Sequence, residues 1–334
     1  MRYRLLAVCC CLTFLGCRDD FSLEGPYQDV PVAYAFLNPQ DSRHFVRVEK
    51  AFLESGGDAT EIAGIADSIY YGPGDVTVLL ENLTTGAGTE LERVDARDFG
   101  RERADGIFAT DPNIAYTVSN EDLNLRGGDQ VRLTLQRPGE EDAVATTRLI
   151  SEIEIRRPGD MIRIDDYSRP LVMSWSKEDN AAIYDIRIRM NIRELFPSDP
   201  DRNRDRTLEW VVAAGFVPGA DQESTSLVRF DVRNEGFYQF LGGNLEPIDG
   251  VVRRFSDFDV VVSAAGQEVL DRRNLESANT GVTSSQSLPR YTNLSGGIGT
   301  ITANTRSVRE AVQIDDASRD SLINGIYTRD LGFR

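Results

Sequence analysis

Hydrophobic and polar side chains alternate along most of this chain with a period of two residues. Val131, Leu133 and Leu135 are separated by polar residues, and a Pro-Gly pair leads from them to a second alternating segment at residues 143–150. A period of two places successive side chains on opposite faces of a β-strand, and a Pro-Gly pair between two such segments favours a turn. This part of the sequence therefore predicts a β-hairpin.

The same alternation predicts further strands on both sides of this hairpin. Before it, we expect strands at residues 32–37, 45–53, 75–80 and 114–118, and a short helix at 59–69. After it, we expect strands at residues 171–175, 184–192, 208–213, 227–232 and 258–264, and short helices at 236–241, 268–275 and 318–323. The predicted fold class is therefore all-β with a few short helices.

The pattern is interrupted once, at residues 156–159, where two arginines precede a proline and a glycine. Two charges followed by two chain breakers are typical of a boundary between domains. We therefore predict an N-terminal β-sandwich over residues 28–150 and a C-terminal β-sandwich with insertions over residues 151–306. Residues 307–334 are a tail that the pattern does not assign.

One feature of the second domain resembles fibronectin type III domains, which are immunoglobulin-like sandwiches. Trp175 ends one predicted strand and Tyr184 begins the next, as in strands B and C of that fold. The resemblance implies that the Trp175 ring lies in the core instead of forming an exposed surface for a ligand.

The amino terminus has the pattern of a secretory signal peptide. A short basic head precedes an apolar run at residues 5–15, and Gly16 stands directly before Cys17. This run is about half of the roughly 20 residues that a membrane-spanning helix needs. A small residue before a cysteine is typical of a lipobox, where cleavage follows the attachment of diacylglycerol to the cysteine sulfur. We therefore predict a signal peptide at residues 1–16 and lipidation of Cys17, with ordinary cleavage nearby as the alternative.

Residues 17–27 are predicted to form a lipidated tether. Acyl chains on Cys17 hold a protein at a membrane because each buried methylene group contributes about 0.8 kcal/mol. The tether begins with Arg18, Asp19 and Asp20, which resemble the signal that exports Bacteroidota lipoproteins to the outer face of the outer membrane. A solvated tether whose charges have no targeting role is the alternative, and the sequence leaves both interpretations open.

Charge and cysteine usage exclude several classes of function. The chain has 37 basic and 54 acidic residues, and removal of residues 1–16 with their two arginines leaves 35 against 54, a net charge of −19. This charge disfavours nucleic acid as a partner and is repelled by an anionic membrane surface, so we expect attachment through lipid. All four cysteines lie at or before Cys17. The mature chain therefore has no disulfide, cysteine nucleophile or thiolate zinc site.

Candidate catalytic residues are few. His44 is the only histidine, and it stands at the start of a predicted strand, where we expect it to be exposed. A serine triad needs an oriented imidazole, and no acidic pair is distinguished by its spacing as in a glycosidase. The sequence therefore predicts no catalytic residue and no cofactor.

The best metal candidate is a run of oxygen-bearing side chains at every second position, formed by Asp199, Asp201, Asn203 and Asp205. The spacing is similar to that of calcium-binding loops. The sixth position, Arg204, replaces the glycine of an EF-hand, and the arginines between the acids weaken the attraction for a cation. A solvated loop is favoured over a calcium site.

A glycine cluster at residues 296–299 is too short for a dinucleotide-binding fingerprint, and the residues that follow it alternate like a strand. Glycine inside a strand allows a bulge or a close approach of two backbones. We expect one of these two roles here.

Segments at both ends of the mature chain are similar to the opening and closing motifs of a known family. They are residues 34–39 (YAFLNP), 41–42 (DS), 46–53 (VRVEKAFL) and 291–299 (YTNLSGGIG). The family is a large group of uncharacterised Bacteroidota outer-membrane lipoproteins with a domain of unknown function. Genes of this family often lie beside genes of TonB-dependent receptors, so the resemblance implies such a receptor as a partner. It supplies no catalytic residue, and the residues after Ser307 extend beyond the usual end of the family.

Together, these observations predict an outer-membrane lipoprotein that faces the cell exterior. We expect a non-catalytic binding or accessory module that works with a TonB-dependent transporter in nutrient uptake. A structural, adhesion or secretion-machinery component of the cell envelope is the alternative, and a carbohydrate-active enzyme is third. The sequence names no ligand.

Overall fold

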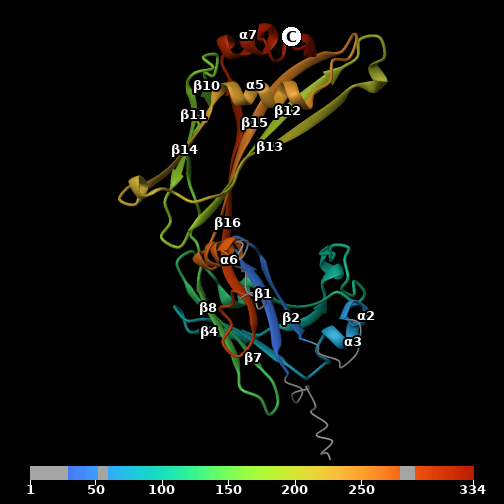
Figure 1. Ribbon diagram of the computed structural model, residues 1–334, viewed down its shortest axis with the longest axis vertical. Helices are drawn as coiled ribbons and strands as arrows, with labels where there is room; N and C mark the ends of the chain where they lie inside the picture. Colours follow the sequence, from blue (N-terminus) through green and yellow to red (C-terminus); the bar gives the residue numbers. More distant parts are fainter. Residues whose placement is uncertain (1–28, 52–58, 279–289) are drawn as a thin grey trace, which may run out of the picture.

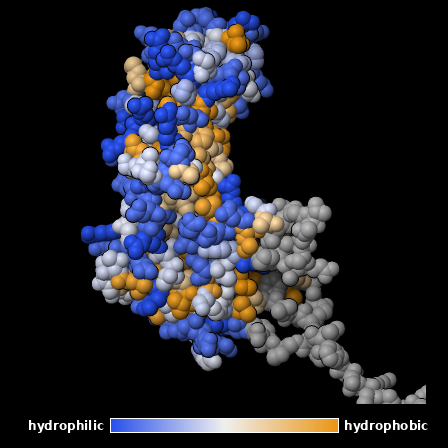
Figure 2. All heavy atoms as spheres, turned by 60° about the vertical axis from the view of Figure 1, so that its left-hand side comes forward, coloured by the Kyte–Doolittle hydropathy of each residue, from blue (hydrophilic) through white to orange (hydrophobic). Residues whose placement is uncertain are grey.

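The protein consists of two lobes built from β-sheets and a few short helices (Figure 1). The computed structural model describes residues 29–51, 59–278 and 290–334. The lobes lie end to end along the long axis, and one strand runs through both (Figure 1). Another face of this elongated body is mostly hydrophilic, with a narrow strip of hydrophobic residues along the upper lobe (Figure 2). The predicted all-β fold class is confirmed.

The N-terminal lobe has two sheets, with strand orders β16-β1-β2-β6-β5 and β4-β3-β7-β8. The strands are β1 (Pro31–Leu37), β2 (Arg43–Lys50), β3 (Thr77–Asn82), β4 (Ala87–Glu90), β5 (Glu92–Asp95), β6 (Ile114–Ser119), β7 (Gln130–Gln136), β8 (Ala143–Arg148) and β16 (Ile298–Ile314). The connections contain α2 (Ala59–Ala63), α3 (Ala66–Ile69), α4 (Asn120–Leu123) and the 3-10 helix η2 (Ala96–Phe99). Buried side chains from both sheets form one core, because the alternation on each strand turns its apolar residues inward.

The C-terminal lobe has sheets with the orders β13-β12-β15-β16 and β14-β11-β9. The strands are β9 (Ile155–Arg157), β10 (Met161–Ile162), β11 (Pro170–Ser176), β12 (Ile183–Leu195), β13 (Arg204–Phe216), β14 (Leu227–Arg233) and β15 (Val252–Ala265). The helices are α5 (Asn234–Asn244), α6 (Gln267–Ala278), α7 (Asp316–Asn324), and the 3-10 helices η3 (Pro200–Arg202), η4 (Ala220–Gln222) and η5 (Arg329–Leu331). Trp175 on β11 is fully buried, with its ring 5.3 Å from that of Tyr184 on β12. The predicted core position of Trp175 is confirmed.

The predicted strands and helices are present with shifted ends. The helix expected at residues 59–69 is two short helices, α2 and α3. The strand expected at residues 45–53 begins earlier, at Arg43, and its last two residues lie outside the described residues. Alternation therefore located the elements, while their ends depend on tertiary contacts.

Strand β16 joins the two lobes. Its residues 298–303 pair in parallel with β1, and residues 304–312 pair antiparallel with β15. At Gly299 the backbone has φ +146°, and a Cβ atom there would overlap the carbonyl oxygen of Ala33. The glycine cluster therefore allows a close approach of two backbones, as the sequence predicts.

Two predicted domain boundaries need correction. The N-terminal sandwich expected at residues 28–150 also contains the first part of β16, from near the end of the chain. Residues 307–334 are part of the C-terminal lobe: they continue β16 and form α7 and η5. The Ile164 amide donates to Ser318 Oγ at 2.7 Å, and Tyr238 donates to the Ser318 carbonyl at 3.1 Å. Alternation cannot reveal such pairing, because it identifies strands and not their neighbours.

A buried ion pair holds the last residues of the chain. Arg253 on β15 and Glu194 on β12 are both fully buried, with Arg253 Nε 2.8 Å from Glu194 Oε1. Arg253 Nη1 also donates to the Leu331 carbonyl at 2.6 Å. Burial alone raises the pKa of Glu194, but hydrogen bonds from Arg253 and Arg204 outweigh it, and the net pKa is lowered. The carboxylate therefore stays ionised between its partners.

We expect Gly299→Ala to destabilise the protein by about 3 kcal/mol or more, because a methyl group there strains the backbone and separates β1 from β16. Gly243→Ala is the control, since a Cβ atom at Gly243 meets nothing within 4 Å. Its effect should be at most about 1 kcal/mol. Urea unfolding measures both variants, and similar losses would contradict this role of Gly299.

We expect Glu194→Ala to lower the free energy of unfolding by about 3–5 kcal/mol, because Arg253 is then buried without a carboxylate. Glu81→Ala is the control. It removes an ion pair of similar length, 2.7 Å between Glu81 and Arg132, whose side chains are 37% and 41% exposed. Its effect should be small because water screens exposed pairs. Denaturant titration of the two variants gives the comparison, and a Glu194 variant as stable as the control would rule out the buried pair as a major contribution.

Candidate ligand-binding site

Cys17 and the adjacent Arg18, Asp19 and Asp20 lie outside the described residues. The first part of the chain that is described is bound to the N-terminal lobe. Tyr71 donates from its hydroxyl group to Asp29 Oδ1 at 2.6 Å, and Arg137 Nη1 donates to the Asp29 carbonyl at 2.6 Å. The chain enters this lobe at the end remote from the C-terminal lobe (Figure 1).

The candidate calcium residues lie in the connection between β12 and β13. Asp199 and Asp201 flank the start of η3, and Asp205 lies on β13. The Asn203 side-chain oxygen accepts a hydrogen bond of 2.8 Å from the Phe196 backbone amide. In the described ranges of the chain, no group of three or more acidic, cysteine or histidine residues is placed to bind a metal ion. These four residues thus belong to the connection between two strands, and the Asn203 side chain is already hydrogen-bonded to the backbone.

His44 is buried, with 2% of its surface exposed, so the expectation of an exposed residue is wrong. It lies opposite Val118 where β2 pairs with β6, and its ring turns toward the interior. Nε2 is 3.1 Å from Asn120 Oδ1, and Nδ1 has no hydrogen-bond partner among the described residues. Burial lowers the pKa of His44, and the hydrogen bond to Asn120 and the charge of Asp41 oppose this only in part.

Another site, which the sequence pattern did not indicate, lies at the beginning of β2. Arg43 and Phe45 project from the outer face of β2, whereas Phe99 ends η2 and Arg101 follows it. Gly100 between them has φ +68°, a left-handed conformation that glycine adopts at little cost, and it ends the 3-10 helix. The two segments therefore place two phenylalanines and two arginines together.

The side chains of Arg43, Phe45, Phe99 and Arg101 contact one another in a row, and we call them the arginine–phenylalanine site. The rings of Phe45 and Phe99 meet edge to face, with centroids 5.5 Å apart. Arg101 lies over Phe45 at 4.3 Å, and Arg43 lies over Phe99 at 5.1 Å. Each guanidinium is attracted to the negative face of a ring and is oriented by it.

Neither guanidinium of this site has a hydrogen bond or an acidic partner within the part of the chain that the structure describes. Neighbouring arginines differ. Arg103 donates to Glu49 at 2.7 Å and to Tyr70 at 3.0 Å, and Arg47 donates to an asparagine side chain at 2.7 Å. The donors of these neighbours are occupied, whereas those of Arg43 and Arg101 are open to a ligand.

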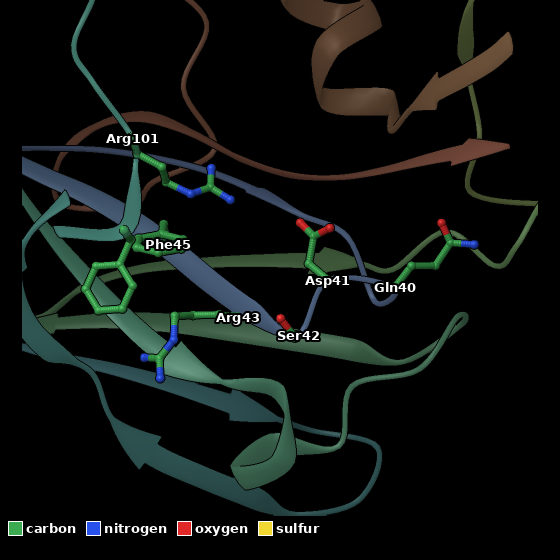
Figure 3. Close-up of a pocket in the computed structure, with 7 residues that line it drawn as sticks. Gln40, Asp41, Ser42, Arg43, Phe45 and Arg101 are labelled. Atoms are coloured by element: carbon green, nitrogen blue, oxygen red, sulfur yellow. The ribbon is translucent and has the colours of Figure 1, made fainter. Parts of the chain in front are cut away.

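The arginine–phenylalanine site lines a pocket of about 550 Å3 around the turn between β1 and β2. The pocket is lined by Gln40, Asp41, Ser42, Arg43, Phe45, Phe99 and Arg101. Gln40 and Asp41 lie toward one end of it, and Phe45 and Arg101 toward the other (Figure 3). A second pocket of about 520 Å3 shares residues 40–43 and continues past Ser119, Glu121 and Asn124. Both volumes are in the usual range for small-ligand sites.

One sequence signal could have indicated this site. Arginine and phenylalanine alternate in both segments, at positions 43 and 45 and again at 99 and 101. Alternation alone places each pair on one face of its segment, but only the fold shows that the two faces meet.

Comparison with known proteins indicates no family for this chain. No protein-family model matches the chain, and no curated protein sequence is significantly similar to it. None of the helices in the described residues is long and apolar enough to cross a membrane.

We expect His44→Gln to remove part of the pH dependence of stability. Because the pKa of His44 is lowered in the folded protein from its ordinary value of 6.5, the unfolded chain takes up this proton first as the pH falls. The wild-type free energy of unfolding should thus decrease below about pH 6.5, by up to about 1.4 kcal/mol per pH unit, until the folded-state pKa is reached. Urea unfolding across this range compares the slopes, and equal slopes would contradict the buried neutral imidazole.

Proposed function

We propose that this protein is a lipid-anchored binding module of the outer membrane that captures an anionic ligand at the arginine–phenylalanine site. One observation carries the proposal: Arg43 and Arg101 line the same pocket, and their guanidinium groups have no hydrogen-bond acceptor among the residues that the structure describes. Guanidinium groups form paired, charge-assisted hydrogen bonds with carboxylate, sulfate and phosphate groups. An anionic group at this site would gain such bonds from groups that are already oriented.

The positive charge of these two arginines contrasts with the negative charge of the whole protein. The chain has a net charge of −17, and an anionic ligand is repelled by most of such a surface. Arg43 and Arg101 form no ion pair among the described residues, so they give an anionic ligand a defined place to bind. Local charge complementarity then supplies the specificity of binding, although the whole protein repels an anion.

The anchor and the site would lie on the same lobe. The hydrogen bonds to Asp29 bind the entry of the chain to the N-terminal lobe, so a lipid on Cys17 would place this lobe next to the membrane. The C-terminal lobe would then extend outward (Figure 1). The site surrounds the turn after Leu37, at the opposite end of β1 from the entry of the chain. We propose a TonB-dependent transporter as the partner that receives the ligand.

The role that we propose is binding without catalysis. His44 is the only histidine, and its ring is buried against an asparagine, with no carboxylate hydrogen-bonded to it among the described residues. A general base needs access to a substrate proton and an orienting partner. The observed contacts of His44 instead suit a structural role.

We also propose that the C-terminal lobe is an immunoglobulin-like sandwich of the fibronectin type III kind. The contact between Trp175 on β11 and Tyr184 on β12 supports this proposal, as do the two sheets around them. A structural role in the envelope is the alternative function. It is favoured by β16, whose continuous pairing connects both lobes into one elongated body.

We expect Cys17→Ser to abolish incorporation of radiolabelled palmitate and to release the protein from the membrane fraction. The physical reason is that the lipid would be the only strong attachment of a body with this negative charge. Cys11→Ser, in the same predicted signal segment, is the control and should still be lipidated. Equal labelling of the two variants would show that Cys17 is not the lipidated residue.

Nutrient capture can be separated from a structural role by complementing a deletion strain. We expect growth on one nutrient to be lost in the deletion strain, restored by the wild-type protein and by Arg132→Gln/Arg229→Gln, and not restored by Arg43→Gln/Arg101→Gln. Both double variants remove two positive charges, but Arg132 and Arg229 are exposed and paired with acids away from the pocket.

The same strains test the alternative. Full growth on every nutrient together with loss of surface attachment would favour the structural role over capture. Cross-linking of outer membranes that recovers no transporter with the wild-type protein would remove the proposed partner.

A further inference from the structure

We infer that the ligand of the arginine–phenylalanine site is an acidic sugar, a carbohydrate that bears carboxylate or sulfate groups beside free hydroxyl groups. This inference rests on the proposed capture function and names its ligand class. It follows from three properties of the lining: separate cationic and acidic ends, an exposed aromatic surface, and an adjoining second pocket.

The cationic end offers an anionic group the guanidinium of Arg101 over Phe45 or that of Arg43 over Phe99. Arg43 and Arg101 lie over phenylalanine rings, which accept no conventional hydrogen bond. A carboxylate or sulfate group has several oxygens that can accept from such donors.

The other end disfavours a second charge close to the first. Asp41 contributes a carboxylate to the same pocket, and Gln40 and Ser42 contribute an amide and a hydroxyl group. A carboxylate repels another anion but accepts hydrogen bonds from hydroxyl groups. The pocket is thus complementary to a ligand in which an acid group and hydroxyl groups stand side by side, as they do on a uronic acid or a sulfated sugar.

An acidic peptide or a polyphosphate fits this lining less well. Such ligands repeat their charges with few hydroxyl groups between them, and they would bring anions against Asp41 and against Glu121 in the second pocket. A sugar chain with an acidic unit followed by a neutral one would instead direct hydroxyl groups of the neutral unit toward Glu121, Ser119 and Asn124.

The aromatic surface adds a contact that a simple ion cannot use. Phe99 is 42% exposed and lines the pocket. The C–H faces of sugar rings are apolar, and burying them against an aromatic ring is favourable. Inorganic sulfate or phosphate would leave this ring in water.

The test is binding of the lipidated protein, purified in detergent, to an array of uronate-containing and sulfated oligosaccharides. Each glycan is paired with its carboxyl-reduced or desulfated form, and oligo-glutamate peptides are included. We expect binding to acidic glycans and at least about 10-fold weaker binding to their neutral partners. Arg43→Gln/Arg101→Gln should lose at least about 10-fold in affinity, and Phe99→Ala should weaken glycan binding with a smaller effect on sulfate alone. Arg132→Gln/Arg229→Gln should bind like the wild type.

The outcomes distinguish the ligand class from the capture function. Equal binding of acidic and neutral glycans, or binding of no glycan, overturns the acidic sugar. Binding of oligo-glutamate alone, lost in Arg43→Gln/Arg101→Gln, also overturns it but leaves capture of an anion at this site intact. Glycan binding that Arg43→Gln/Arg101→Gln leaves unchanged, with thermal unfolding like that of the wild type, overturns both the ligand class and the site.

Discussion

The pairing of β16 with both β1 and β15 is the constraint on which the rest of the structure depends. One strand completes a sheet in each lobe, running parallel to β1 and then antiparallel to β15. Parallel pairing brings together segments from opposite ends of the chain, and the loss of chain entropy must be offset by the core that both sheets bury. Gly299 makes the approach to Ala33 possible. The sheet of the N-terminal lobe is therefore complete only when residues from both ends of the chain have paired.

The same pairing positions the candidate site. Strand β1 lies between β16 and β2, so strands within a sheet hold both ends of the turn that forms the pocket. Arg43 and Phe45 belong to β2 itself, and the side chain of Asn113 holds the backbone of Arg101 through a hydrogen bond of 2.7 Å. Side chains on such supported elements keep a defined geometry, which reduces the entropy lost when a ligand binds.

Arginines in this lobe have two different roles, and their neighbours decide which. Arg47 and Arg103 donate to groups of the protein, so they connect β2 to the segments packed on its outer face. Arg43 and Arg101 contact rings that accept no conventional hydrogen bond, and their N–H groups have no acceptor in the described ranges of the chain. Arginine supplies nearly all of the positive charge of this chain. Composition therefore gives no indication of which arginines form a site.

The sequence by itself determined the strands and most helices, because alternation and chain breakers act locally. The resemblance to fibronectin type III domains indicated the buried ring of Trp175, and the glycine cluster left a bulge and a close approach of two backbones as alternatives. The sequence also determined that all four cysteines lie at or before Cys17. Only the tertiary structure decided that β16 completes the N-terminal lobe, that His44 is buried, and that Phe45 meets Phe99. These depend on which strands and segments become neighbours, and a period of two specifies the face of a strand but not the partner that covers it.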